Sequence, residues 1–278
     1  MAIGISRVGT AGWTIPSQYA SQFPGKGTHL ERYARRFNAV EINSSFYRPH
    51  RRATYQRWAA SVPPDFQFSV KTPKAITHER RLADCDDLAN RFIDEVQGLG
   101  DRLGVILVQL PPSLAFSKEL LPALRRLRDQ SDTSIQCEPR HASWFTPHVD
   151  ATLAEMGVGR IAADPPLGPG ADRPGGGGSL AYFRLHGAPP IYWSRYEHAA
   201  LETWSVAALN EMSKGRETWV ILDNTAAGFA IENAFELQTL LDSDVGGADP
   251  DEERPVNPAS YRERAPIACD PLRDNPRA

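Results

Sequence analysis

Acidic, basic and imidazole side chains recur in this chain at the downstream ends of short apolar segments. Glu138 and Arg140 end one such segment, and Lys71 ends another. Arg184 and His186 end a third. A strand that is buried on both faces is nearly continuous in Val, Ile, Leu and Phe, so packing does not explain charged groups at its end. Because ligands of α/β folds bind where the carboxyl ends of the strands meet, the pattern predicts a ligand site there.

These side chains are suited to acid/base chemistry on an anionic substrate. Glu138, His186 and Glu41 are the candidates for catalytic proton transfer, because a carboxylate or an imidazole can gain and release a proton. Arginine forks and a lysine ammonium bind phosphate or carboxylate groups, and loop aromatics stack on a sugar or a base. The residues expected to bind the substrate are Lys71, Arg140, Arg184, Asn43, Gln109, Asp223, Asn224, His141, Trp13 and Tyr47.

Two other interpretations of the same residues remain open. In the first, pairs such as Glu138–Arg184 and Glu41–Lys71 are internal ion pairs that set the strand register and have no chemical role. In the second, a divalent metal ion is the cofactor, and its ligands are Glu138, Asp164, His186 and Asp223. The sequence contains no HxH or HExxH spacing, so the motifs assign no metal site and the cofactor is unknown.

The alternation of side chains along a strand tests whether these polar groups share a face. On each of four predicted strands the polar residues have one parity and the apolar residues have the other. The polar set is Glu41 and Asn43, Ser69 and Lys71, Gln136, Glu138 and Arg140, and Tyr182, Arg184 and His186. Further strands extend the set with Thr10, Gln109, Asp164 and Asp223. We therefore expect the polar groups to line the interior or the mouth of the fold.

Strand-like and helix-like segments alternate along the chain. Strands are predicted near residues 5–12, 39–46, 66–72, 103–110, 134–139, 159–164, 180–186 and 217–223. Amphipathic helical segments lie at 29–37, 54–61, 88–100, 118–129, 147–157 and 200–212, and one more follows at 228–242. This order predicts an α/β fold, a (β/α)8 TIM barrel with parallel strands. Residues 165–179 contain too much Pro and Gly for a helix, so we expect the barrel to be irregular between strands 6 and 7.

Length and composition are ordinary for a globular protein. Of the 278 residues, 41% are hydrophobic and 23% are charged, and residues 1–242 are expected to form a single TIM-barrel domain. Residues 243–278 are rich in Pro, Asp, Glu and Arg, which predicts a polar tail that is disordered or loosely docked. The net charge of −3 provides no global attraction to nucleic acid. No apolar stretch is long enough for a membrane span, and three cysteines without a CxxC motif favour the cytoplasm.

Seven motifs carry a resemblance to a known family. They are VGTAGW at 8–13, VEINSSFYRP at 40–49, FSVKTPKAITH at 68–78, VILVQLPPS at 105–113, EPRHASW at 138–144, YFRLHG at 182–187 and LDNTAAGFAIENA at 222–234. In order and wording they resemble the YecE-like family, domain of unknown function 72, over roughly residues 5–240. The resemblance implies a TIM-barrel fold and no established activity, substrate or cofactor.

The preferred hypothesis is an enzyme that acts on a small anionic or phosphorylated, sugar-like compound by acid/base chemistry at the carboxyl ends of the strands. It would be an isomerase, a lyase or a hydrolase. One alternative is a divalent-metal-dependent phosphoesterase or nuclease. The other is a non-catalytic module that binds a small ligand or nucleic acid. The expected partner is a small anionic molecule, nucleic acid is not favoured, no membrane is expected, and the sequence does not determine the oligomeric state.

Overall fold

The computed structural model of the chain describes residues 4–246. Its strands are short and mostly parallel. They are β1 (Ser6–Thr10), β2 (Ala39–Ile42), β3 (Gln67–Lys71), β4 (Leu103–Gln109), β5 (Ser134–Glu138), β6 (Val158–Arg160), β7 (Ala162–Asp164), β8 (Gly175–Gly176), β9 (Leu180–Leu185) and β10 (Glu217–Leu222). All of the predicted strand segments therefore contain strand residues.

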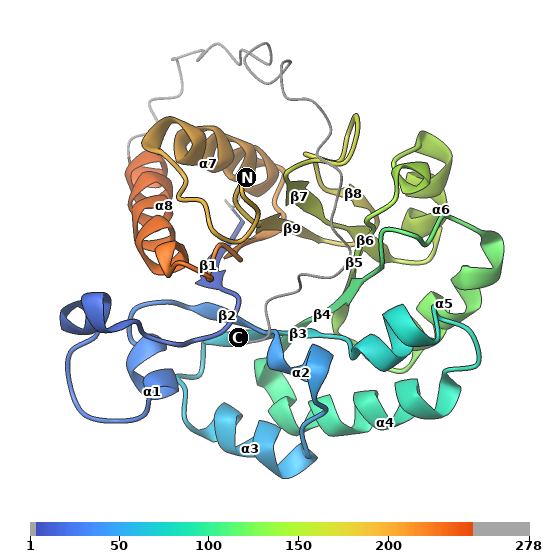
Figure 1. Ribbon diagram of the computed structural model, residues 1–278, viewed down its shortest axis with the longest axis horizontal. Coiled ribbons are helices and arrows are strands. Elements are labelled where there is room, and N and C mark those ends of the chain that lie inside the picture. The colour runs from blue at the N-terminus through green and yellow to red at the C-terminus, as the bar shows by residue number, and fades with distance from the viewer. Residues whose placement is uncertain (1–3, 247–278) are drawn as a thin grey trace.

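The helices alternate with these strands and surround them (Figure 1). They are α1 (His29–Tyr33), α2 (Ser44–Tyr47), α3 (Arg52–Ala60), α4 (Asp86–Val96), α5 (Leu121–Asp129), α6 (Pro147–Glu155), α7 (His198–Ser213) and α8 (Phe229–Gly246). Short helical turns lie at Ser17–Gln22, Ala75–Glu79, Gln97–Arg102, Lys118–Leu120 and Ala142–Trp144. The expected α/β fold with parallel strands is confirmed.

The strand pairing gives two sheets and does not show one closed barrel. One sheet has the order β2-β3-β4-β5-β6-β8, and the other has the order β1-β10-β9-β7. An isolated parallel bridge between Ala11 and Glu41 lies where β1 approaches β2. On the opposite side, Ile161 separates β6 from β7, so one predicted strand contributes to both sheets. The closed (β/α)8 barrel is thus an expectation that the hydrogen-bonded ladders do not establish.

Two local predictions differ from the structure. The strand predicted over 39–46 ends at Ile42, because Asn43 has helical angles (φ −80°, ψ −25°) and is the N-cap residue of α2. Between β7 and β9 there is no helix, as the Pro and Gly content predicts, but the segment contains β8, which pairs with β6 in antiparallel orientation. Gly176 in β8 has a positive φ of 65°, which an L side chain rarely adopts.

Helix starts follow the local sequence. Thr28 forms a capping box before α1, since its hydroxyl accepts from the Glu31 amide while the Glu31 carboxylate accepts from the Thr28 amide. Thr146 caps α6 in a similar way and Pro147 occupies the first turn, where a missing N–H has no cost. These caps fix where the chain turns back after it has left a strand.

Apolar side chains form two clusters. The larger one lies between strands and helices and contains Val40, Ile42, Phe68 and Val70. The smaller one contains side chains of opposite parity, such as Leu107, Tyr182, Trp219 and Ile221. Polar residues with the same parity as this smaller cluster, such as Glu41 and Arg184, are therefore directed away from the helices.

The described residues include only a short part of the chain after the predicted domain boundary at residue 242. Helix α8 extends to Gly246, four positions past residue 242. The rest of the predicted tail, residues 247–278, lies outside the described residues. Within residues 4–246, no helix is both long enough and apolar enough to cross a membrane.

Candidate functional site

Arg184 of β9 lies at the centre of a buried charge cluster. Its Nε and Nη2 donate to the two carboxylate oxygens of Glu41 at 2.9 and 2.7 Å, a bidentate pair between β9 and β2. Its Nη1 donates to Glu138 Oε2 at 3.2 Å, and Nη2 lies 2.9 Å from Asp223 Oδ2. Burial alone would lower the pKa of Arg184, but Asp223, Glu41 and Glu138 raise it well above its ordinary value. One guanidinium thus contacts three carboxylates, from β2, from β5 and from the residue after β10.

His186, two residues downstream and directly after the end of β9, lies between two carboxylates. Its Nδ1 is 3.0 Å from Asp223 Oδ2, and its Nε2 is 2.9 Å from Glu138 Oε1. The same Nε2 is also 3.1 Å from Arg140 Nη1. Glutamate in its ionised form can only accept and arginine can only donate, so the imidazole nitrogen faces one partner of each kind.

Glu138 contacts both Arg184 and His186. Its Oε1 accepts hydrogen bonds from Gln109 at 3.1 Å and from Arg140 at 2.9 Å, in addition to its contact with His186. Burial would raise the pKa of Glu138, but Arg184, followed by His186 and Arg140, holds it well below its usual range. Glu138 is therefore a carboxylate at neutral pH, although it is almost completely buried.

Lys71 of β3 and Asp223 after β10 complete the charged set. The Lys71 ammonium lies 4.2 Å from the centroid of the Phe46 ring, a cation–π contact, and the residue is 3% exposed. Burial opposes ionisation of Asp223, but Arg184, then His186 and Lys71, lower its pKa. Three carboxylates and three cations, with one imidazole between them, therefore share a single buried region.

Two amide side chains border this region. Gln109 of β4 donates to Glu138, as described above. Asn43 follows β2 with the parity of Glu41 and is also buried, and its Oδ1 has no hydrogen-bond partner within the described part of the chain. This oxygen is an acceptor that a donor group of a ligand would satisfy.

Other predicted site residues have contacts outside the cluster. His141 Nδ1 lies 2.9 Å from Ser143 Oγ and caps a short helical turn. Asn224 donates to the Ser194 carbonyl and to Asn233, both at 2.9 Å. The Thr10 hydroxyl lies 3.0 Å from the Tyr33 hydroxyl of α1, so it does not extend the ring as we expected.

The two aromatic residues predicted to bind the substrate, Trp13 and Tyr47, are both partly exposed. Trp13 packs edge-on against Trp58 with ring centroids 5.0 Å apart, and it is half-buried. Tyr47 in α2 is 36% exposed and packs edge-on against Phe46 at 5.0 Å. Of these two rings, Tyr47 is the one connected to the charged cluster, because Phe46 also contacts Lys71.

The residues predicted as metal ligands do not form a metal site. The Asp164 carboxylate accepts a hydrogen bond of 2.5 Å from the Tyr196 hydroxyl, and the Asp164 carbonyl accepts from the His186 amide at 2.9 Å. Arg184 contacts both Glu138 and Asp223, and a guanidinium between two carboxylates opposes a divalent cation there. No group of three or more His, Cys, Asp or Glu side chains in residues 4–246 has a metal-binding arrangement. The residues therefore do not fit the metal-dependent alternative.

Sequence reasoning gave no individual role to three aromatic residues that lie near the site. The Tyr182 hydroxyl lies 3.0 Å from Ser69 Oγ and 3.2 Å from Glu41 Oε2, and its strand parity placed it on the polar face without assigning it a role. Phe46 is the ring under Lys71. Tyr196 bonds Asp164 from a loop, and no periodic signal in the sequence could have indicated this contact.

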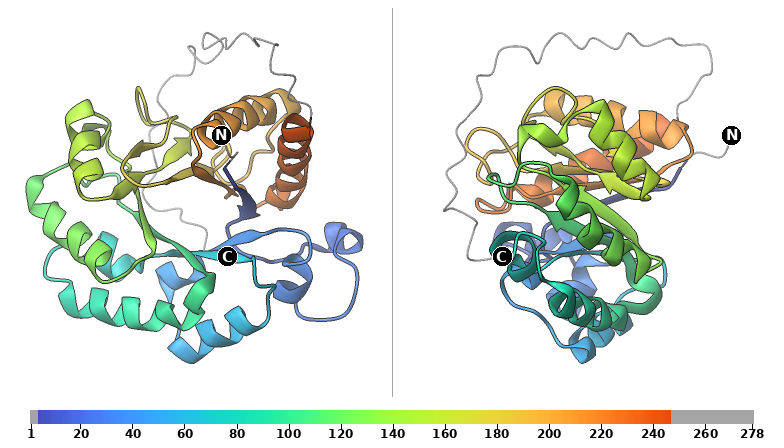
Figure 2. Two further views of the ribbon diagram at one scale, coloured as in Figure 1. Left: turned by 180° about the vertical axis from the view of Figure 1, so that it is seen from behind. Right: turned by 90° about the vertical axis from the view of Figure 1, so that its right-hand side faces the viewer.

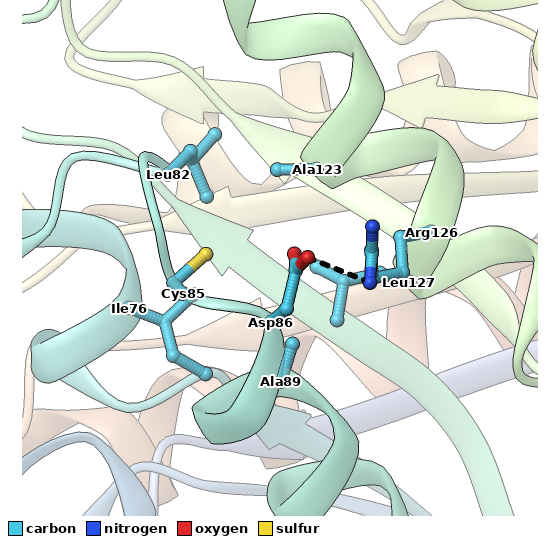
Figure 3. A pocket seen from close by; sticks show the side chains of 8 residues that line it. All are labelled: Ile76, Leu82, Cys85, Asp86, Ala89, Ala123, Arg126 and Leu127. Atoms are coloured by element: carbon cyan, nitrogen blue, oxygen red, sulfur yellow. Dashed lines mark ion pairs between the residues drawn. The ribbon is translucent and has the colours of Figure 1, made fainter.

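A separate apolar pocket lies between α4 and α5 (Figure 3). Cys85, Ile76 and Leu82 line it, and the exposed pair Asp86–Arg126 borders it. Burial raises the pKa of the Cys85 thiol, which keeps it protonated and unreactive. The space does not admit a water molecule, so we assign it no ligand.

Sequence comparison identifies relatives of this chain. A model of the family described as "Protein of unknown function DUF72" matches residues 7–258. UPF0759 protein YecE of Escherichia coli strain K12 is 33% identical over 144 residues, which are 49% of this chain and 52% of YecE. The chain thus spans about half the length of YecE in this match. UPF0759 protein YunF of Bacillus subtilis strain 168 is 26% identical over 282 residues, 87% of this chain and 97% of YunF.

Solved structures of the same family have a similar fold. A DUF72 family protein of Thermotoga maritima matches with a TM-score of 0.71 and 25% identity over 86% of this chain and 99% of its own. A DUF72 family protein of Enterococcus faecalis matches with a TM-score of 0.72 and 23% identity, over 86% and 96% of the two chains. The second similarity concerns the fold alone.

Proposed function

The chain belongs to the DUF72 family, and we propose that it is an enzyme that acts on a small anionic or phosphorylated, sugar-like compound by acid/base chemistry. The family description names no activity, so the proposal rests on the site of this chain. Its reaction class would be one in which a proton is removed from one position of the substrate and delivered to another.

The observation that carries the proposal is the position of His186 Nε2 between Glu138 and Arg140, at 2.9 and 3.1 Å. With a proton on Nε2, the nitrogen donates to the Glu138 carboxylate. Without that proton, the same nitrogen accepts from the Arg140 guanidinium. Since both states have a hydrogen-bond partner already in place, little rearrangement accompanies proton transfer, and this is the property that a general acid/base requires.

The neighbouring groups have distinct tasks in this proposal. Asp223 holds Nδ1 of the imidazole and orients the ring, as a carboxylate does in other His–carboxylate pairs. Lys71 and Arg140 supply the positive charge for the anionic group of the substrate. Arg184 uses its N–H groups for contacts with Glu41, Glu138 and Asp223, so these groups do not bind a substrate in the proposal. In the proposal Arg184 and Glu41 are therefore positioning residues, with Glu138 and His186 as the proton-transfer groups.

We also propose that the two sheets act as one ring of strands with a common mouth. Support comes from the Ala11–Glu41 bridge beside β1 and β2 and from the continuity of β6 and β7 through Ile161. In addition, Arg184 of β9 forms a direct side-chain hydrogen bond with Glu41 of β2 across the centre. Such a ring would collect the carboxyl ends of all strands in one place.

A cytoplasmic location fits the same proposal. Both cysteines in the described part of the chain, Cys85 and Cys137, are buried and unpaired. A reducing compartment maintains such thiols.

Deuterium incorporation tests the acid/base proposal. A panel of sugar phosphates is incubated with the protein in heavy water, and carbon-bound deuterium is measured by NMR. We expect exchange with at least one member of the panel, and the rate should fall at least about a hundredfold in His186→Gln. The glutamine side chain fills a similar space but cannot take up a proton.

The control is Arg57→Gln on the exposed surface of α3, which should exchange at the wild-type rate. An unchanged rate in His186→Gln would exclude His186 as the acid/base group. Titration with inorganic phosphate forms a second arm, in which Lys71→Met should weaken binding about tenfold or more and Arg57→Gln should not. Equal binding by Lys71→Met would refute the anion-binding role.

A further inference from the structure

The loop between β9 and α7, residues 187–197, lies directly beside the imidazole of the proposed site. Tyr192 packs edge-on against His186 with ring centroids 5.5 Å apart. Its amide donates to the His186 carbonyl at 2.7 Å, and its carbonyl accepts from Ala226 at 3.1 Å. The loop connects the end of β9 to the start of α7 (Figure 2). It is therefore a wall of the same region that holds Glu138 and Asp223.

Buried side chains hold this loop in one conformation. Asn233 of α8 accepts from the Tyr196 amide at 3.0 Å and donates to the Tyr196 carbonyl at 2.9 Å. Asn224 donates to the Ser194 carbonyl and to Asn233. The Tyr196 hydroxyl donates to Asp164 and accepts from the Gly187 amide at 2.7 Å. We call Asn224, Asn233 and Tyr196 the loop latch.

The latch supports a backbone conformation that is otherwise unfavourable. Tyr192 has a positive φ of 70°, which is uncommon for a residue with a side chain. Strained residues persist where the surrounding structure determines them, and they concentrate at binding and catalytic sites. Next to Tyr192 the loop exposes Trp193, whose relative exposure is 58%. It is the largest of the exposed apolar side chains in residues 4–246.

Exposure of this indole has no packing explanation. A rigid loop that directs tryptophan toward solvent loses the burial that would stabilise the fold, about 25 cal/mol for each Å² of apolar surface. Trp193 directly follows Tyr192, whose ring packs on His186, and successive Cα atoms are about 3.8 Å apart, so the Trp193 backbone lies next to the site. An aromatic face beside a charged site is the usual arrangement for a ligand with a ring and an anionic group.

We propose that Trp193 is a ligand-binding residue that stacks on the ring of a ring-bearing phosphate whose anionic group lies at Lys71 and Arg140. The inference rests on the proposed function and narrows its substrate class. Acyclic phosphates would use the cations alone. A sugar ring and a nucleobase present the same stacking chemistry, and the experiment distinguishes them.

Calorimetric titration of the full chain tests the proposal with four probes: inorganic phosphate, glycerol 3-phosphate, glucose 6-phosphate and adenosine 5′-monophosphate. In Trp193→Ala we expect Kd for at least one of the two ring-bearing probes to rise roughly tenfold. Kd for inorganic phosphate and glycerol 3-phosphate should stay within about twofold. The ring-bearing probe that loses affinity identifies the source of the ring. Because Trp193 is exposed, its replacement should not disturb folding.

Val206→Ala on α7 is the matched control, since Val206 is also exposed, at 45%, and lies away from the loop. Its four Kd values should equal those of the wild type. If Trp193→Ala lost affinity equally for all four probes, or lost affinity for none of them, the role of Trp193 would be overturned. If Lys71→Met still weakens phosphate binding in that case, the proposed function stands without the inference. If the wild type binds none of the probes, the proposed anion site fails and the inference fails with it.

Discussion

Arg184 is the cation on which the buried carboxylates of the site depend. Glu41, Glu138 and Asp223 all contact its guanidinium, and Arg184 and Glu41 are both fully buried. Removal of one partner from a buried ion cluster leaves charges that neither water nor protein neutralises. The stability of this region and the ionisation of the site are therefore properties of the same side chain.

We predict that Arg184→Met lowers the free energy of unfolding by about 3–5 kcal/mol, measured by urea denaturation at neutral pH. The control is Arg52→Met, which removes an exposed pair with Asp94 and should cost at most about 1 kcal/mol. A loss in Arg184→Met no larger than in the control would show that the cluster does not depend on the guanidinium.

The lowered pKa of Glu138 predicts a dependence of stability on pH. An ordinary Glu titrates near pH 4.3 in the unfolded chain. Because the pKa of Glu138 is lower in the folded protein, its contribution is fully present above that range and is lost as the pH falls toward the folded value. Asp223, whose pKa is also lowered, changes stability in the same direction.

Urea denaturation at pH 7 and at about pH 3.5 tests this dependence. The wild type should lose stability on acidification, and Glu138→Gln, which has no proton to gain at this position, should lose less. Glu155→Gln on the exposed surface of α6 is the control, since it leaves the contacts of Glu138 intact. An equal loss in Glu138→Gln and wild type would refute the assigned ionisation.

At the scale of elements, strands and helices were predictable from the sequence and the loops were not. The eight strand segments followed from runs of Val, Ile, Leu and Phe, and their polar ends followed from period-two alternation. The loop after β9 has no period, and its conformation depends on Asn233 and Tyr196, which come from different parts of the chain. Asn224 is an example, because the sequence predicts that it binds substrate but gives no sign that its amide nitrogen also donates to this loop.

We predict that Tyr196→Phe accelerates hydrogen exchange at the Gly187 amide by roughly tenfold, because this amide loses its acceptor. Amides of β3 and β4 should exchange at wild-type rates. Tyr55→Phe on α3 is the matched control, since it removes a buried hydroxyl far from the loop along the chain. Unchanged exchange at Gly187 in Tyr196→Phe would show that the latch does not hold the loop.

At the scale of the whole molecule, the approach of β1 to β2 decides whether the two sheets form one ring. Gly9 of β1 lies against the backbone of Ala39 at the start of β2, and a Cβ on Gly9 would come within 2.1 Å of the Ala39 carbonyl oxygen. A backbone atom cannot move aside as a flexible side chain does. The seam therefore requires glycine at this position.

We predict that Gly9→Ala lowers the free energy of unfolding by about 1–3 kcal/mol, measured by urea denaturation. Gly168→Ala is the matched control, because no atom lies within 4 Å of its Cβ position and its φ is not positive. It should change stability by less than about 0.5 kcal/mol. Equal stability of the two variants would indicate that β1 and β2 are not in close contact.

The sequence by itself determined the α/β order of elements and the face on which Glu41, Lys71, Glu138, Arg184 and His186 lie. Both are local properties, because side-chain direction in a strand depends on parity alone. Only the tertiary structure decided the partners. Glu41 contacts Arg184, 143 positions away along the chain, a partner that parity alone does not specify. Parity selects a face, whereas the distance across the fold and the packing of each loop select which side chains on that face meet.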